Sequence, residues 1–182
     1  MSDFLNWLPA ILGVLALCFA AYLIGKVGKA DPGTERMQEI AGHIHQGAKA
    51  FLTAEYRILV FFVVILFVAI GLGIGWVTAV CFLAGALFST AAGYIGMNVA
   101  TKANVRTAAA AKNGGQNAAL SVAFSGGAVM GMCVVGFGLF GACIIYMLTG
   151  NPDTLSGFSL GASSIALFAR VGGGIYTKAA DV

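Results

Sequence analysis

Three ionisable residues stand close together near the end of an otherwise apolar stretch. Arg170, Lys178 and Asp181 surround a run of three glycines, Gly172–Gly174. On a helix that turns 100° per residue, Thr177 and Asp181 fall within about 20° of the Arg170 direction, and Lys178 lies about 80° to one side. One helical face is therefore expected to carry a deep arginine and, about 16 Å further along the axis, a carboxylate with a lysine beside it.

These residue types suit phosphate chemistry. Lysine contacts phosphate as a mobile point charge, and a carboxylate such as Asp181 can bind Mg²⁺ together with substrate phosphates. The Walker A spacing is absent, and simple snorkelling of Lys178 with Asp181 ending the helix explains these two residues equally well. A functional role is favoured for Arg170, because an ionisable residue several turns inside a span normally faces a bundle interior with a partner. We find no acidic residue deep enough in the other expected spans, so we expect its partner on a helix outside these residues.

The composition is that of a polytopic membrane protein. Hydrophobic residues make up 59% of the 182, charged residues 9%, and the mean hydropathy is +0.92. A soluble domain would carry roughly a quarter charged residues. The net charge of +3 without a basic run gives no reason to expect nucleic-acid binding. The four cysteines all lie in apolar segments with no CxxC pair, so buried hydrophobic packing is expected rather than a metal or disulfide framework.

The fold class expected is an all-α membrane bundle. Each of five apolar stretches has about the 20 residues needed to cross a hydrocarbon core. These expected spans are residues 4–24, 51–72, 76–100, 118–148 and 157–182. They form one transmembrane domain, with cytoplasmic loops at about 25–50 and 101–117.

The basic residues predict the orientation of these spans. All ten lysines and arginines fall on one side of the five-span arrangement, whereas the other side carries Asp3, an uncharged turn at Gly71–Gly75 and Asp153. The positive-inside rule puts the basic side in the cytoplasm and the N-terminus outside. The N-terminal segment lacks the positive start of a signal peptide, so it is expected to be a retained span. The Arg170–Asp181 end of the last span then faces the cytoplasm.

Two helices are expected to continue beyond the membrane. Apolar residues recur at three- and four-residue spacing from Thr34 to Ala50, which predicts an amphipathic helix that is capped by Thr34 and runs on into the second span. The third span is expected to continue to Asn113-Gly114-Gly115, where the glycines stop it, and a new helix is expected to start at about Gln116.

Other residues in these regions give weaker indications of a binding site. His43 and His45 fall on different helix faces and are expected to be solvated rather than metal ligands. Lys102 and Arg106 lie one turn apart and could face an anion, but basic residues at a cytoplasmic helix end are the favoured interpretation. In the fourth span, the GxxxG pattern from Gly127 is expected to allow close helix packing.

Two sequence runs resemble a known family. The end of the chain, Phe168-Ala169-Arg170-Val171-Gly172-Gly173-Gly174-Ile175-Tyr176-Thr177-Lys178-Ala179-Ala180-Asp181-Val182, closely resembles the signature of the membrane-bound, ion-pumping inorganic pyrophosphatases. The run Gly96-Met97-Asn98-Val99-Ala100-Thr101-Lys102-Ala103-Asn104-Val105-Arg106-Thr107 is similar to the end of that family's third helix. The resemblance extends over essentially the whole sequence.

The resemblance implies a fold and an activity. Such proteins are homodimers with about sixteen spans in each subunit, and they hydrolyse magnesium pyrophosphate in a cytoplasmic funnel while driving H⁺ or Na⁺ outward. Carried over to this sequence, Lys178 would contact pyrophosphate, Asp181 would bind Mg²⁺ and Arg170 would lie on the ion-transport path. A K⁺ requirement depends on the subfamily, and a bacterial inner membrane is the expected location.

The resemblance also implies that further parts are needed. The family's other carboxylates, the rest of its funnel and its exit gate lie beyond the matched region, so we expect an N-terminal portion of a longer pump that is inactive alone. The alternative is part of a secondary transporter or channel in which Arg170 binds an anionic substrate. A purely structural bundle ranks last, because it leaves the position of Arg170 unexplained.

Overall fold

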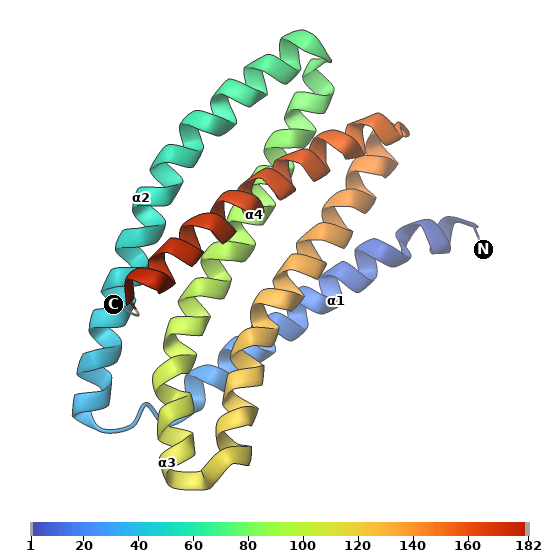
Figure 1. Cartoon of the computed structure of the whole chain (residues 1–182). Helices are drawn as coiled ribbons and strands as arrows, with labels where there is room; N and C mark the ends of the chain where they lie inside the picture. Colours follow the sequence, from blue (N-terminus) through green and yellow to red (C-terminus); the bar gives the residue numbers. More distant parts are fainter. Residues whose placement is uncertain (1, 181–182) are drawn as a thin grey trace.

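Four long helices make up the described part of the chain, which a computed structural model covers from residue 2 to residue 180. They are α1 (Ser2–Lys29), α2 (Glu35–Gly73), α3 (Trp76–Thr149) and α4 (Pro152–Ala180). Figure 1 shows them side by side in one elongated bundle, with the C-terminal end of α4 beside α2. Side chains are described for residues 6–178. The all-α expectation is confirmed for this part of the chain.

The helix boundaries follow short-range signals in the sequence. Thr34 caps α2, since its side-chain oxygen accepts a hydrogen bond from the Met37 amide at 3.4 Å. The helix then runs without interruption from the amphipathic segment into the second apolar stretch, as predicted. The turn into α3 passes through Gly75, whose φ of 155° is a conformation that few other residues adopt. Both the cap and the turn were therefore predictable from local sequence.

The third helix is bent on itself at Gly115. The backbone there leaves helical geometry, with φ 73° and ψ −167°, so that α3 consists of two arms, 76–114 and 116–149. The predicted glycine stop after Asn113 is confirmed. Instead of five separate helices, the structure has four elements, because the third and fourth expected stretches belong to this single bent helix. Figure 1 shows the two arms side by side, joined at the bend.

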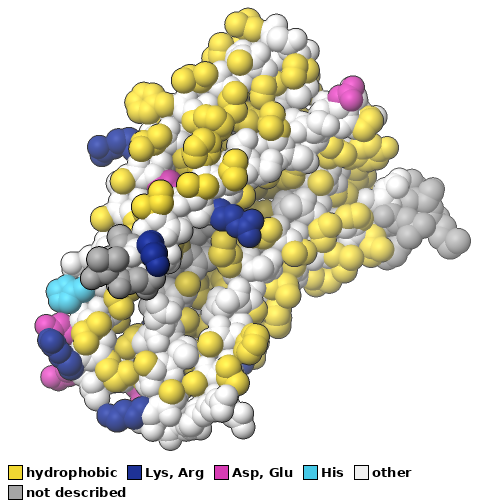
Figure 2. Space-filling model, viewed as in Figure 1, with side chains coloured by type: hydrophobic (Ala, Val, Ile, Leu, Met, Phe, Trp, Pro, Cys, Tyr) yellow, Lys and Arg dark blue, Asp and Glu magenta, His cyan; other side chains and the backbone are white. Residues whose placement is uncertain are grey.

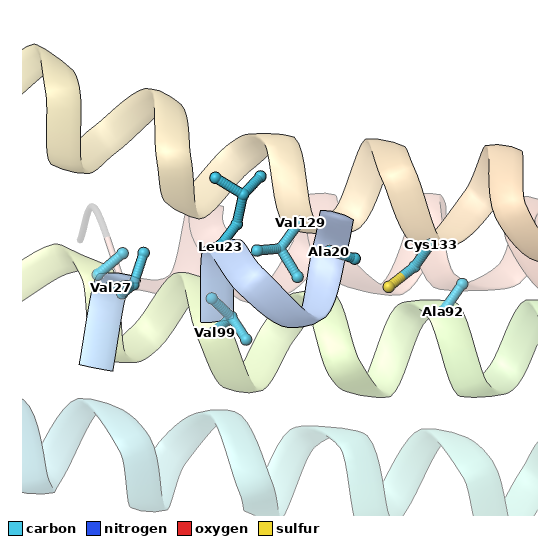
Figure 3. Close-up of a cluster of buried hydrophobic side chains, with 8 residues drawn as sticks. Ala20, Leu23, Val27, Ala92, Val99, Val129 and Cys133 are labelled. Atoms are coloured by element: carbon cyan, nitrogen blue, oxygen red, sulfur yellow. The ribbon is translucent and has the colours of Figure 1, made fainter. Parts of the chain in front are cut away.

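Helix α3 is the centre of the bundle, and the other three helices pack on it. Its two arms and α1 enclose the main core cluster, drawn in Figure 3. Val129, from the second arm, is fully buried between the two other segments. The cluster contains Ala20, Leu23, Val27, Ala92, Val99, Ala103, Val129 and Cys133. The helices are therefore held by small and branched apolar side chains.

Glycines allow the helices to touch backbone to backbone. A Cβ on Gly13 of α1 would lie 2.8 Å from the Gly136 carbonyl oxygen, and one on Gly136 would lie 2.9 Å from the Gly13 oxygen. On α4, a Cβ on Gly161 would overlap the Phe82 carbonyl oxygen of α3. Close approach of this kind is how small residues promote packing of membrane helices.

The glycines that make these contacts are not those of the predicted GxxxG pattern. Gly127 and Gly131 are exposed and have open space around them among the described residues, so close packing at these two glycines stays a prediction. The pattern gives the spacing of small residues along one helix. It does not say which face the neighbouring helix covers.

All four helices are long and apolar enough to cross a membrane, judged by length and composition over the described residues. Large hydrophobic side chains remain exposed along α1, α2 and α3, among them Tyr22 and Phe61. Figure 2 shows hydrophobic side chains over much of one face and basic side chains toward the end at which α2 begins. This distribution is typical of a multi-pass membrane protein.

Candidate functional site at the charged end of α4

The last three turns of α4 carry the predicted site residues Arg170 and Lys178. The helix continues through the three glycines to Ala180, so Arg170 and Lys178 belong to one regular element, about 12 Å apart along its axis. Both side chains are exposed. Asp181 lies outside the described residues, and its predicted role as a metal ligand stays a prediction.

Helix α2 holds this end of α4 from one side. Phe62 meets Phe168 edge to face, with ring centroids 4.8 Å apart, and Phe51 stacks on Tyr176 at 5.0 Å. Between these two aromatic pairs, Gly172 lies against α2 so closely that a Cβ there would be 2.9 Å from the Glu55 Oε1 atom. Phe168, Gly172 and Tyr176 are spaced four residues apart and form one stripe on α4.

Arg170 points away from this contact with α2. It is two residues, or about 200° of rotation, from Gly172 and therefore lies on the opposite side of α4. Thr177 shares the Arg170 direction, and its hydroxyl donates a hydrogen bond to the Gly174 carbonyl oxygen at 3.0 Å. A Cβ on Gly173 or Gly174 would meet nothing within 4 Å. This face of α4 thus presents an arginine beside small residues, with backbone that a neighbouring group can approach closely.

One further acidic residue, Glu55, was not among the predicted site residues. It lies inside the second expected span, and both of its carboxylate oxygens are buried without a hydrogen-bond partner among the described residues. Because it faces α4 at Gly172, it is on the side opposite Arg170 and forms no ion pair with it in the described part of the chain. A single acidic residue within a long apolar stretch was the available signal. That Arg170 has an acidic partner on a helix outside this chain stays a prediction.

The two histidines differ in their surroundings. His43 is exposed, as expected, but His45 is half-buried against α3, and its Nδ1 atom lies 3.3 Å from the Thr101 hydroxyl oxygen. The expectation of a solvated His45 is therefore wrong, because the amphipathic part of α2 packs on the first arm of α3. Arg106 donates a hydrogen bond to the Lys102 carbonyl oxygen at 2.9 Å within its own helix.

The described residues supply too few ligand side chains in one place for a metal ion. Among residues 2–180, no three His, Cys, Asp or Glu side chains gather closely enough to hold an ion. The residues that the structure describes therefore do not make up a Mg²⁺ site by themselves.

Comparison with known proteins identifies the family. The family model for inorganic H⁺ pyrophosphatase matches residues 14–182. A Clostridium tetani protein, provisionally named a K⁺-stimulated pyrophosphate-energized sodium pump, is 62% identical over all of this chain and 27% of its own length. The K⁺-insensitive pyrophosphate-energized proton pump of Methanosarcina mazei is 48% identical over 94% of this chain and 26% of its own length. The K⁺-stimulated pyrophosphate-energized sodium pump of Thermotoga maritima is 39% identical over 94% and 27%, respectively.

The chain spans about a quarter of the length of these curated relatives. The match begins within α1 and includes both arms of α3 and the charged end of α4. Since the family model covers most of the sequence, this chain belongs to the inorganic H⁺ pyrophosphatase family.

Proposed function

We propose that the protein containing these 182 residues couples hydrolysis of inorganic pyrophosphate to outward transport of H⁺ or Na⁺. Family membership and the names of the relatives support this activity. The single structural observation that carries it is the charged end of α4. That helix is fixed from behind by α2 and α3 and presents Arg170 and Lys178 at two levels of its exposed surface. This chain would supply one wall of the pump.

Lys178 is proposed to bind the substrate. It is exposed in the last described turn of α4, where an ammonium group can meet pyrophosphate at the cytoplasmic surface without being buried. Asp181, three residues further on, is proposed to bind Mg²⁺ through its carboxylate, and Mg²⁺ would neutralise charge on the phosphates. Further carboxylates from the remainder of the pump would complete the site.

Arg170 is proposed to couple hydrolysis to transport. A cation that passes within about 4 Å of a guanidinium is repelled by roughly 4 kcal/mol at an effective dielectric constant of 20. Arg170 therefore controls cation passage by its position alone. Because α4 is continuous from Arg170 to Lys178, a displacement of the substrate end carries the arginine with it. The exposed small residues on the same face leave room for this movement.

The membrane arrangement follows from the same proposal. We propose that the two arms of α3 cross separately, which gives five crossings with α1, α2 and α4. The N-terminus would lie outside and the charged end of α4 in the cytoplasm of a bacterial cell. The complete pump would be a homodimer with about sixteen spans in each subunit, and its K⁺ requirement would depend on the subfamily.

The test compares Arg170→Ala with Arg36→Ala in the full-length protein reconstituted in vesicles. Arg36 is a matched control, because it is an exposed cytoplasmic arginine that pairs with Glu39 at 2.7 Å on the surface. Arg170→Ala should lower the number of ions transported per pyrophosphate hydrolysed, whereas Arg36→Ala should leave it unchanged. An unchanged ratio in Arg170→Ala, with normal transport, would rule out the coupling role.

A further inference from the structure

A pocket of about 230 Å³ lies between α2 and the first arm of α3, away from α4. It is lined by His45, Ala48, Lys49, Leu52, Thr53, Tyr56, Tyr94, Met97, Asn98 and Thr101. No residue of α4 contributes to it, so it is separate from the charged site described above. Its lining extends across the expected cytoplasmic ends of the second and third spans, which lie near residues 51 and 100. The pocket is thus at the depth of the lipid headgroups.

The charge of the pocket is positive. Lys49 is exposed at its mouth, and a shallow groove continues along α2 from Lys49 to Arg57. Neither the pocket nor the groove is lined by an acidic residue. The Glu55 carboxylate, also on α2 at this level, is not part of the lining and faces α4 at Gly172. Two basic side chains at this depth favour an anionic group.

Several hydrogen-bond donors in the pocket are available to a ligand. Within residues 2–180, neither the Lys49 ammonium nor the Tyr94 hydroxyl has an acceptor, and only one N–H of the Asn98 amide is used, by the Tyr94 carbonyl oxygen at 2.8 Å. His45 differs from these. Its Nδ1 atom is already engaged by the Thr101 hydroxyl oxygen, 3.3 Å away. Among the described lining residues, the donors available to a ligand are therefore Lys49, Tyr94 and Asn98.

Exposed apolar side chains continue from the pocket toward the membrane centre. On α2, Val60 and Val64 extend the stripe of Lys49 and Thr53, because these positions are separated by four, seven and four residues. The two valines are 60% and 55% exposed. A basic headgroup pocket with an apolar surface directly below it matches the two parts of a phospholipid.

A second stripe of exposed apolar side chains runs along α3 from the pocket toward the membrane centre. Val80 and Leu87 precede Tyr94 at intervals of seven residues and are 57% and 59% exposed. Residues at this interval return to within about 20° of one direction on a helix. Acyl chains that lie between the two stripes would leave the phosphate of the lipid at Lys49 and Asn98.

We propose that this pocket binds an anionic phospholipid of the cytoplasmic leaflet. Its phosphodiester accepts hydrogen bonds from Lys49, Tyr94 and Asn98, while its acyl chains cover the Val60–Val64 and Val80–Leu87 stripes. The occupant is a lipid rather than free phosphate, because the apolar stripes lead directly from the donors into the membrane. Bound there, the lipid ties the cytoplasmic part of α2 to α3.

The test measures binding of phosphatidylglycerol to the full-length protein in detergent by native mass spectrometry, with phosphatidylcholine as the neutral lipid. Lys49→Glu should weaken phosphatidylglycerol binding by roughly tenfold or more, since each charge near an anionic lipid is worth about fivefold and the reversal changes two. Tyr94→Phe should weaken it by a few fold through loss of one donor. Lys29→Glu, an exposed lysine at the end of α1, is the matched control and should bind like the wild type.

Three results would overturn the proposal. Phosphatidylcholine bound as tightly as phosphatidylglycerol would show a general acyl-chain contact. Displacement of the lipid by millimolar inorganic phosphate would show a site for free phosphate. Equal binding by Lys49→Glu and Lys29→Glu, with both variants eluting as the wild type does, would show that another part of the protein covers the pocket.

Discussion

A methyl group on Gly161 would force α4 away from α3. The Cβ of alanine at this position would overlap the Phe82 carbonyl oxygen and come within 2.9 Å of the Ala86 amide nitrogen. Both are backbone atoms of a helix, so neither can move aside by a change of rotamer. The two helices must separate instead, and the charged end of α4 moves with its helix.

The expected cost follows from this geometry. Overpacking a close contact costs about 1–3 kcal/mol, and replacing a helical glycine by alanine returns up to about 1 kcal/mol of helix propensity. Gly131→Ala supplies the same gain in propensity with open space around the new methyl group, so it is the matched control. The difference between the two variants therefore measures the packing term, about 1–3 kcal/mol.

The assay is thermal unfolding of the full-length protein in detergent. Gly161→Ala should unfold about 1–2 °C below Gly131→Ala, since the Tm shift is the packing term divided by an unfolding entropy of about 2.1 cal/mol/K per residue, and relatives of this chain are about four times its length. Its rate of pyrophosphate hydrolysis should also fall, because the site depends on how α4 is placed. Equal unfolding midpoints for the two variants would refute the backbone contact between α3 and α4.

Three further predictions concern the chemistry. Lys178→Ala should lower the rate of pyrophosphate hydrolysis by the full-length protein by at least about 100-fold, because it removes one preorganised electrostatic contact to a reacting phosphate. Steady-state release of phosphate measures this rate. Asp181→Ala should abolish Mg²⁺-dependent hydrolysis, whereas Asp153→Ala, at the opposite end of α4, should not; normal activity of Asp181→Ala would remove this residue from the site. The isolated 182-residue chain in vesicles should release no phosphate above background, because a water nucleophile needs several carboxylates and metal ions.

The elements that the sequence predicted best are those that depend on neighbouring residues. The cap at Thr34, the turn before Trp76 and the bend at Gly115 each follow from one or two residues whose backbone preference is strong. The continuous path of α2 from its amphipathic segment into the apolar stretch was also visible as an uninterrupted helical period.

Features that depend on contact between distant segments were not predictable in this way. The glycines at the helix contacts, Gly85 and Gly161 among them, look no different in sequence from Gly127 and Gly131, which face open space. The burial of Glu55 likewise arises only when Gly172 of α4 comes to lie over it. Which face of a membrane helix is covered is decided by its neighbours, because every face is apolar.

The position of Arg170 on α4 was predictable from the sequence only in part. Helical spacing alone predicted that Arg170 and Thr177 share a face, and α4 is indeed helical throughout this stretch. Only the contacts of Phe168, Gly172 and Tyr176 with α2 fix the opposite face as the packed one. That assignment puts Arg170 on the exposed face of α4.

The measurement that tests the central claim most directly is ion transport driven by pyrophosphate. The full-length protein containing this chain is reconstituted in sealed vesicles with its cytoplasmic side outward, and Mg²⁺-pyrophosphate is added outside while internal pH and Na⁺ are followed. We predict that H⁺ or Na⁺ accumulates inside, and that vesicles with the Lys178→Ala variant accumulate neither ion. Hydrolysis of pyrophosphate without accumulation of either ion in tightly sealed vesicles would contradict it.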